Sequence, residues 1–122
     1  MPISILASAI YDVLRPMVPG HNVSITYTEL VNSLPLLPPQ YADLQPRDPR
    51  LDEALGELVH ACRAQNLPAI SALVVRNDTK QPGNGYYGAA HPGVDDDEER
   101  TVAWGHEAET ARQTEYPEHL DD

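Results

Sequence analysis

The sequence predicts an α+β fold of the winged helix-turn-helix type, with three helices, a β-hairpin wing and a further acidic helix at the C-terminus. Three observations lead to this prediction. Apolar residues recur at helical spacing near both 3–15 and 49–65, a helix-start signal lies between these stretches, and a β-branched run with turn-forming residues follows them. We expect one domain over residues 1–122, with helices and wing in 1–94, the acidic helix in 95–115 and a frayed tail in 116–122.

The first predicted helix covers about residues 3–15. Its apolar residues return every three or four positions, as one buried helical face requires: Ile3, Leu6, Ala7, Ile10, Val13, Leu14 and Met17. Pro16 and the pair Pro19-Gly20 then end the helix.

The second predicted helix, about 27–34, begins at the sharpest local signal in the chain. Thr26 and Glu29 have the spacing of a capping box, in which the threonine hydroxyl accepts from the glutamate amide and the glutamate side chain reaches back. Ile25 and Leu30 are placed as a hydrophobic staple around this cap. Residues 22–25 are predicted to be briefly extended.

The third predicted helix follows a segment, 35–49, whose five prolines exclude regular structure. Asp48 is a suitable N-cap, and Pro49 is favoured at the first helical position. The buried stripe is Leu51, Ala54, Leu55, Leu58, Val59 and Cys62. Residues 66–68 stop this helix near residue 65.

The predicted wing joins two strands. Residues 70–75 are rich in β-branched side chains, 76–83 have the composition of a turn, and Tyr86 and Tyr87 can pair back as the second strand. A breaker at 89–93 precedes the last helix, about 96–114, which presents Trp104, Ala108 and Ala111 on a narrow stripe.

The letters Gly83-Asn84-Gly85-Tyr86-Tyr87-Gly88 match the G-x-G-x-x-G pattern of dinucleotide-binding loops. That chemistry requires the glycines to follow a strand directly and to open a helix whose amides meet the pyrophosphate. Here a polar turn separates the strand from the glycines, and we expect no helix to begin at Gly85. We therefore expect Gly83 and Gly85 to supply positive φ in a turn or bulge, and predict no cofactor.

The charge is unevenly distributed along the chain. The net charge is −11, yet residues 1–88 contain eight acids and six bases, whereas 89–122 contain eleven acids and two bases. An acidic surface repels nucleic acid and favours a basic partner or simple solubility. No apolar run is long enough to span a membrane, and the single Cys62 suits a reducing compartment, so we expect a cytoplasmic protein without membrane partners.

Residues 22–30, Asn-Val-Ser-Ile-Thr-Tyr-Thr-Glu-Leu, resemble the corresponding stretch of the winged-helix domain in O6-alkylguanine alkyltransferases and alkyltransferase-like proteins. The likeness covers about residues 20–88. This chain lacks the family's active-site cysteine motif, since Ile70-Ser71-Ala72-Leu73 stands there, and Glu53 occupies the place of the base-displacing arginine. The resemblance therefore implies the fold without alkyl transfer or nucleotide flipping.

Residues 67–75 and 82–86, with Trp104 and Glu107 behind them, also resemble a small uncharacterised bacterial winged-helix-like module. This second resemblance implies no activity.

No set of residues has the spacing of a catalytic or metal site. Cys62 lies on the apolar stripe of the third helix, where a buried structural cysteine is expected, and His60 points to another side of that helix. His91, His106 and Glu109 are too few for a metal site, and Ser71 lacks a nucleophile elbow. We expect no enzymatic activity.

The leading hypothesis is a non-enzymatic adaptor or regulatory module that binds a protein, and the acidic charge would suit a partner with a basic surface. Its expected contact residues are Lys80, Asn84, Tyr86, Tyr87, Asp95, Asp96, Asp97, Glu98 and Glu99, although the tyrosines could equally belong to the core. A second hypothesis is an acidic inhibitor from a phage or mobile element that imitates DNA to block a nuclease or another nucleic-acid-binding complex. A third is a DNA-binding transcriptional regulator that uses Arg47, Arg50, Arg76 and Lys80 on phosphates.

Overall fold

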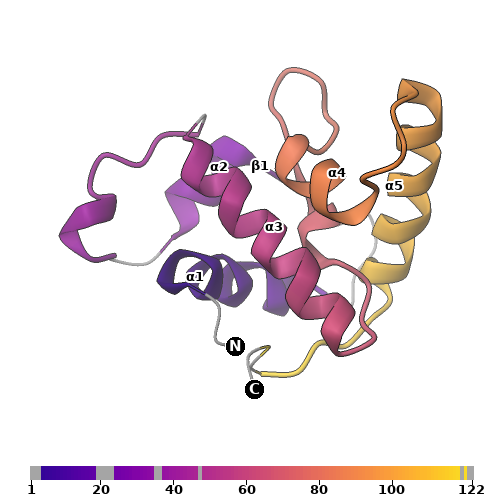
Figure 1. Cartoon of the computed structure of the whole chain (residues 1–122). Helices are drawn as coiled ribbons and strands as arrows, with labels where there is room; N and C mark the ends of the chain where they lie inside the picture. Colours follow the sequence, from indigo (N-terminus) through magenta and orange to yellow (C-terminus); the bar gives the residue numbers. More distant parts are fainter. Residues whose placement is uncertain (1–3, 19–23, 35–36, 47, 119, 121–122) are drawn as a thin grey trace.

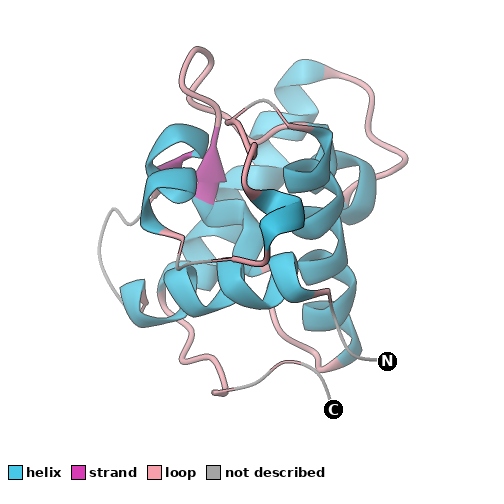
Figure 2. Cartoon of the chain, turned by 90° about the vertical axis from the view of Figure 1, so that its left-hand side faces the viewer, coloured by secondary structure: helices cyan, strands magenta, loops and turns pink. Residues whose placement is uncertain are grey.

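The computed structural model describes the whole chain except residues 1–3, 19–23, 35–36, 47, 119 and 121–122. The described residues form an α+β fold with five α-helices and one small two-stranded sheet. The long helix α3 (Pro49–Ala64) crosses the middle, with α1 (Ile5–Leu14) on one side and α4 (Asn84–Ala90) and α5 (Asp97–Arg112) on the other (Figure 1). Helices dominate the view turned by 90° (Figure 2).

Helix α1 confirms the first predicted helix with slightly narrower bounds. Ser4 is its N-cap and accepts a hydrogen bond from the Ala7 amide at 3.1 Å. The same serine hydroxyl donates to the Glu57 carboxylate on α3 at 2.6 Å. A 3-10 turn, Arg15–Met17, continues the helix. Its buried face is Leu6, Ala7, Ala9, Ile10, Tyr11 and Leu14.

The predicted capping box is present at the start of α2 (Tyr27–Ser33). The Glu29 amide donates to the Thr26 hydroxyl at 3.1 Å, and the Thr26 amide donates to the Glu29 carboxylate at 2.9 Å. Of the extended stretch predicted before the cap, residues 22–23 lie outside the described part. A 3-10 turn, Pro39–Tyr41, follows α2 in the proline-rich segment.

Helix α3 begins and ends where the sequence predicts. The Asp48 side chain accepts from the Arg50 amide at 2.9 Å, and Pro49 takes the first helical position. At the other end Asn66 adopts a φ of 60°, and the Leu67 amide returns to the Cys62 carbonyl at 2.9 Å. All six residues of the predicted apolar stripe are buried: Leu51, Ala54, Leu55, Leu58, Val59 and Cys62.

The predicted β-hairpin wing is wrong. Residues Ile70–Leu73 form a 3-10 helix, only Val74–Val75 form a strand (β2), and residues 84–90 form α4 instead of a return strand. Strand β2 pairs in parallel with β1 (Ile25–Thr26), with Ile25 opposite Val74 and Thr26 opposite Val75. Because Val74 and Val75 are both buried, this strand has no solvent face, as is usual for parallel pairing and unlike a wing.

The C-terminal segment divides into a helix that confirms the prediction and a tail that corrects it. Helix α5 buries Ala108 and Ala111, as its predicted stripe requires. The tail was expected to be frayed, but Tyr116 and Leu120 are buried in the main core. The Tyr116 ring packs edge-on against Tyr11, with centroids 6.3 Å apart, and its hydroxyl donates to the Pro68 carbonyl at 2.7 Å. These contacts tie the chain beyond α5 to α1.

A second, smaller core cluster lies where α3, the 3-10 helix Ile70–Leu73, α4 and α5 meet. It consists of Val59, Ala69, Ala72, Tyr86, Tyr87 and Ala108, with Trp104 packed against it. The Trp104 indole donates to the Ala72 carbonyl at 2.8 Å, so α5 is attached by a hydrogen bond as well as by packing. Within the described residues, no helix has the length and apolar character needed to cross a membrane.

Candidate functional site

Five consecutive acidic residues, Asp95 to Glu99, surround the start of α5 and are all exposed. Asp96 is the N-cap, and its carboxylate accepts from the Glu99 amide at 3.0 Å. Negative charge at a helix N-terminus is stabilised by the free amides and the helix dipole. The fold therefore uses Asp96 directly, while the other four carboxylates face solvent.

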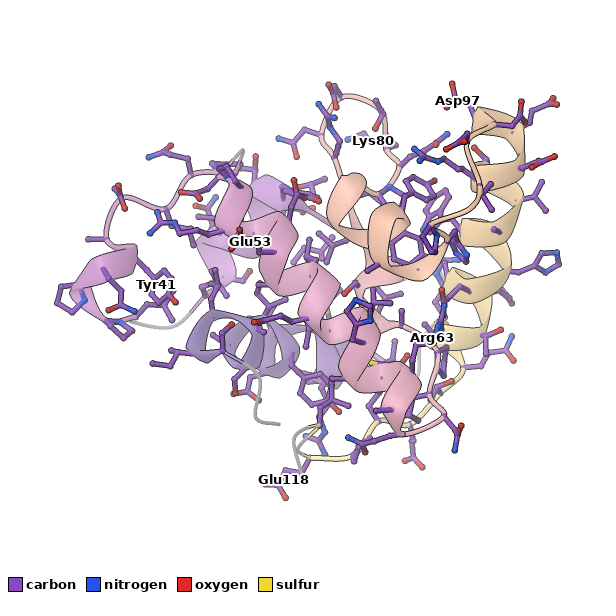
Figure 3. All side chains as sticks on the ribbon, in the orientation of Figure 1. Tyr41, Glu53, Arg63, Lys80, Asp97 and Glu118 are labelled. Carbon is purple, nitrogen blue, oxygen red and sulfur yellow. The ribbon has the colours of Figure 1, made fainter. Side chains whose placement is uncertain are left out.

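The polar loop 76–83 lies beside this acidic run. Gln81 joins the two, because its side-chain oxygen accepts from the Thr101 hydroxyl of α5 at 3.3 Å and from the Tyr87 hydroxyl at 3.5 Å. The loop projects from the body in Figure 1, and Figure 3 shows Lys80 and Asp97 at the same end of the molecule. Lys80 is exposed and has a φ of 58°. The turn predicted for residues 76–83 is therefore present as a tight polar loop, although no β-hairpin follows it.

The first turn of α3 contributes a further carboxylate, Asp52, near this loop. Asp52 is half-buried, and it lines one pocket together with Asp78 of the loop, whereas the adjacent Glu53 is exposed. We name the set Asp52, Asp78 and Asp95 to Glu99 the acidic end. It gathers carboxylates from three segments that are far apart in the sequence.

The arginines near the acidic end are engaged by carboxylates or carbonyls. Arg50 bonds to Asp48 at 2.7 Å and to Asp43 at 3.0 Å, so its guanidinium is turned toward the protein's own acids. Arg76 pairs with Asp78 at 3.3 Å. Arg100 donates to the Val94 carbonyl at 2.6 Å and lies 5.1 Å from the centre of the Tyr87 ring.

Of the phosphate contacts predicted for a DNA-binding protein, Arg47 lies outside the described residues. Arg50 and Arg76 are held by acids, whereas Lys80 is exposed and forms no ion pair with the described residues. No continuous basic face forms at the predicted recognition helix, where Asp48 and Asp52 accompany Arg50.

The structure corrects the assignment of Tyr86 and Tyr87 to a contact surface. They are 1% and 4% exposed, and their rings meet edge-on with centroids 5.3 Å apart. Both therefore belong to the core, which was the alternative left open by the sequence. The side chain of Asn84 lies outside what the structure describes.

Tyr86 takes part in a polar cluster around Glu107 that the sequence did not predict. The Glu107 carboxylate, with 8% of its side chain exposed, accepts from the Tyr86 hydroxyl at 2.7 Å, from the Ala69 amide at 2.8 Å and from the Arg63 guanidinium through two nitrogens. His91 lies 2.8 Å from the Tyr86 hydroxyl and 3.6 Å from Glu107. One carboxylate thus joins α3, α4, α5 and the chain between α3 and β2.

Protonation in this cluster follows from burial and from these bonds. Burial alone would raise the pKa of Glu107, but the hydrogen bonds from Arg63, Ala69 and Tyr86 outweigh it and leave that pKa below the usual value. Burial raises the pKa of Tyr86, and the bond to Glu107 raises it further. Burial lowers the pKa of His91 despite the nearby Glu107. The cluster therefore combines an ionised carboxylate, a protonated phenol and a neutral imidazole at pH 7.

A shallow groove lies over this cluster. It is lined by Arg63, Asn66, Leu67, Pro68, His91, Ala103, His106, Glu107 and Thr110. The only strong charges in it, Arg63 and Glu107, already satisfy each other.

Cys62 is fully buried, and burial raises the pKa of its thiol to about 11. The structural cysteine that the sequence predicted is confirmed, because a buried protonated thiol is a poor nucleophile. His60, in contrast, is exposed. Ser71 is also buried, and its hydroxyl donates to the Leu55 carbonyl at 2.7 Å.

The glycine pattern turns out to serve helix packing. A helix does begin there, contrary to the prediction, and neither Gly83 nor Gly85 has positive φ. A Cβ on Gly85 would lie 2.3 Å from the Asp52 carbonyl oxygen, and one on Gly83 would lie 2.6 Å from the Tyr27 hydroxyl oxygen. On the facing side, a Cβ on Gly56 would be 3.3 Å from the Gly85 carbonyl oxygen. Gly85 and Gly56 therefore let α4 approach the backbone of α3, and Gly83 leaves room for the Tyr27 side chain.

Among the described residues, no group of three or more His, Cys, Asp or Glu side chains is arranged to hold a metal ion. Comparison of the chain with models of protein families, with curated proteins and with solved structures finds no match. The functional assignment therefore depends on the geometry of this molecule alone.

Proposed function

We propose that this chain is a non-enzymatic protein-binding adaptor or regulatory module whose acidic end contacts a basic surface of its partner. The observation that supports this proposal best is that carboxylates from α3, loop 76–83 and the start of α5 make up the acidic end, while the neighbouring arginines are already bound within the protein. Such an end attracts a basic partner and accelerates its association.

We also propose that α1, α2 and α3 correspond to the helical part of a winged-helix scaffold. Their order and the capping box at Thr26 support this relation. The wing is not part of the proposal, because residues 84–90 are helical. A cytoplasmic location is proposed from the free thiol of Cys62.

Apolar surface near the acidic end is limited. Val102, one turn into α5 from the acidic run, is 60% exposed, and Gly105 has no atom near the place of its missing Cβ. A partner that is held by charge around one exposed valine forms an interface whose affinity depends strongly on salt. We therefore expect a complex that weakens steeply as the salt concentration rises.

The test begins with co-purification of a tagged form from lysate of the source organism at low salt. The partner is identified by mass spectrometry, purified and titrated by calorimetry against two variants. In the first, Asp95→Asn, Asp97→Asn, Glu98→Gln and Glu99→Gln remove four charges but keep the Asp96 cap. In the control, Asp12→Asn, Glu109→Gln, Glu115→Gln and Glu118→Gln remove four exposed charges elsewhere.

We expect the first variant to lose at least about tenfold in affinity, since each surface charge pair contributes up to about 1 kcal/mol. The control variant should lose little. Equal losses would mean that only net charge matters, and the proposal would fail. Failure to recover any stoichiometric protein would also contradict it.

The DNA-mimicking inhibitor remains a second proposal, favoured by the same exposed carboxylates. It requires that double-stranded DNA displaces the protein from its partner and that the first variant no longer inhibits the partner's activity on DNA. The DNA-binding regulator predicts instead a mobility shift at low salt. We expect no shift, because Arg50 and Arg76 are bound to acids.

A further inference from the structure

A small pocket opens at the carboxyl ends of the two parallel strands. Tyr27 follows β1 directly and Arg76 follows β2 directly, so both residues are delivered to the same edge of the sheet. The pocket has a volume of about 240 Å³ and is lined by Tyr27, Pro46, Asp52, Arg76, Asn77, Asp78 and Gly83. Pockets for drug-sized ligands run from about 300 to 1,000 Å³, so this one suits a single side chain.

Gly83 keeps the pocket open. Its Cβ would lie 2.6 Å from the Tyr27 hydroxyl oxygen and 3.3 Å from the Asp52 carboxylate. Any other residue at this position would therefore fill the space in front of the two polar groups. The remaining lining consists of Pro46, Arg76, Asn77 and Asp78.

Asp52 has an incomplete set of partners. Its Oδ1 accepts from the Tyr27 hydroxyl at 2.8 Å, whereas none of the described residues donates a hydrogen bond to Oδ2. Burial and the bond to Asp52 both raise the pKa of Tyr27, so the phenol stays protonated and continues to donate. The carboxylate is half-buried and is not neutralised by an ion pair within the described residues.

The charges around the pocket favour a cation. Arg76, the basic residue of the lining, is paired with Asp78 at 3.3 Å. This pair leaves the charge of Asp52 uncompensated, so the lining has one net negative charge. An anion would meet that carboxylate, whereas a guanidinium or ammonium group would complete its hydrogen bonds.

We propose that this pocket receives an arginine or lysine side chain of the partner protein, with its cationic group bonded to Asp52. The inference rests on the proposed function, because it specifies how the acidic end recognises a basic partner. The exposed acids attract the partner, and the pocket selects one basic side chain on it.

The experiment is an NMR titration of the ¹⁵N-labelled full chain with N-acetyl-L-arginine amide. The matched neutral probe is N-acetyl-L-citrulline amide, which has nearly the same shape without the charge. We expect the arginine probe to shift the backbone amides of Arg76, Asn77 and Gly83 with a saturable millimolar affinity. The citrulline probe should bind at least about tenfold more weakly, because hydrogen bonds to charged groups are the stronger ones.

The variant Asp52→Asn should reduce the arginine-probe affinity about tenfold, whereas Glu53→Gln, an equal change of charge on the neighbouring exposed residue, should leave it unchanged. Asp52→Asn retains an oxygen that accepts from Tyr27, and its amide spectrum reports whether it is folded. If it does not fold, the comparison of the two probes on the unaltered chain decides the question alone.

Equal binding of the two probes, shifts confined to residues 95–99, or full binding by Asp52→Asn would each overturn the pocket assignment. These outcomes are distinguishable from failure of the proposed function. A partner that loses affinity when residues 95–99 are neutralised, but not in Asp52→Asn, supports the acidic end and rejects the pocket. If the partner's affinity changes neither when residues 95–99 are neutralised nor in Asp52→Asn, the proposed function itself is rejected.

Discussion

Helix α5 carries two kinds of carboxylate, and they have opposite roles. Glu107 faces the protein, accepts hydrogen bonds from Arg63, Ala69 and Tyr86, and is 8% exposed. Asp95 to Glu99 face solvent at the other end of the same helix, and only Asp96 caps it. The same chemical group thus holds the fold together in one place and is available to a partner in the other, so residue type alone does not indicate function.

The largest effect is expected for Glu107→Ala. Removal of the carboxylate takes one hydrogen-bond acceptor from the Tyr86 hydroxyl and the acceptor of the Ala69 amide, and it removes the ion pair that joins α5 to Arg63 of α3. We expect a loss of about 2–4 kcal/mol in the free energy of unfolding. Chemical denaturation monitored by circular dichroism measures it. Glu109→Ala on the exposed face of α5 is the control, and an equal loss there would remove the distinction between the two carboxylates.

Glycines provide the second comparison. In Gly85→Ala the new methyl group overlaps the Asp52 backbone, which no side-chain rotation relieves, and we expect a loss of about 1–3 kcal/mol. In Gly105→Ala the methyl group meets nothing, and we expect a gain of about 0.5–1 kcal/mol from helix propensity. Thermal unfolding of both variants shows whether each substitution lowers or raises the stability. Stabilisation by Gly85→Ala would refute the close packing of α4 on α3.

Two threonines provide a third comparison, with a smaller expected change in the free energy of unfolding. Thr26→Ala removes half of the capping box and should cost about 1 kcal/mol. The Thr110 hydroxyl only returns to the His106 carbonyl within α5, so Thr110→Ala should change the stability by less than about 0.5 kcal/mol. Urea unfolding curves of the two variants would compare them directly, and similar losses would argue against a special role of the cap.

The smallest expected effect is on the pH dependence of stability, and it comes from replacing His91. Because burial lowers the pKa of His91 in the folded state, the unfolded chain binds the proton more readily, and stability falls as the pH drops below about 6.5. Glu107 opposes this shift and Arg63 adds to it. His91→Gln should therefore flatten the stability profile between pH 7 and 5, whereas His106→Gln on the exposed face should not. Unchanged profiles in both variants would show that His91 does not contribute.

Part of the candidate site was accessible from the sequence. The run Asp95 to Glu99 is visible as composition, and its exposure follows from its charge. Asp52 and Tyr27 were not identified, because their hydrogen bond joins α2 to α3 over 25 positions and no local pattern marks it. Glu107 was noticed only as part of a resemblance, since its partners come from three separate segments.

The sequence by itself determined the features whose causes are local. The N-caps at Thr26 and Asp48, the proline at the start of α3 and the apolar stripes depend on residues within one or two turns of each other. They were predicted because capping and periodicity are short-range. Only the tertiary structure decided that 84–90 is a helix, that β2 pairs with β1 in parallel, and that Tyr86, Tyr87 and Tyr116 are buried. These outcomes depend on close packing between segments that are distant in the chain, where the missing Cβ of Gly85 and the acceptor at Glu107 outweigh local preference.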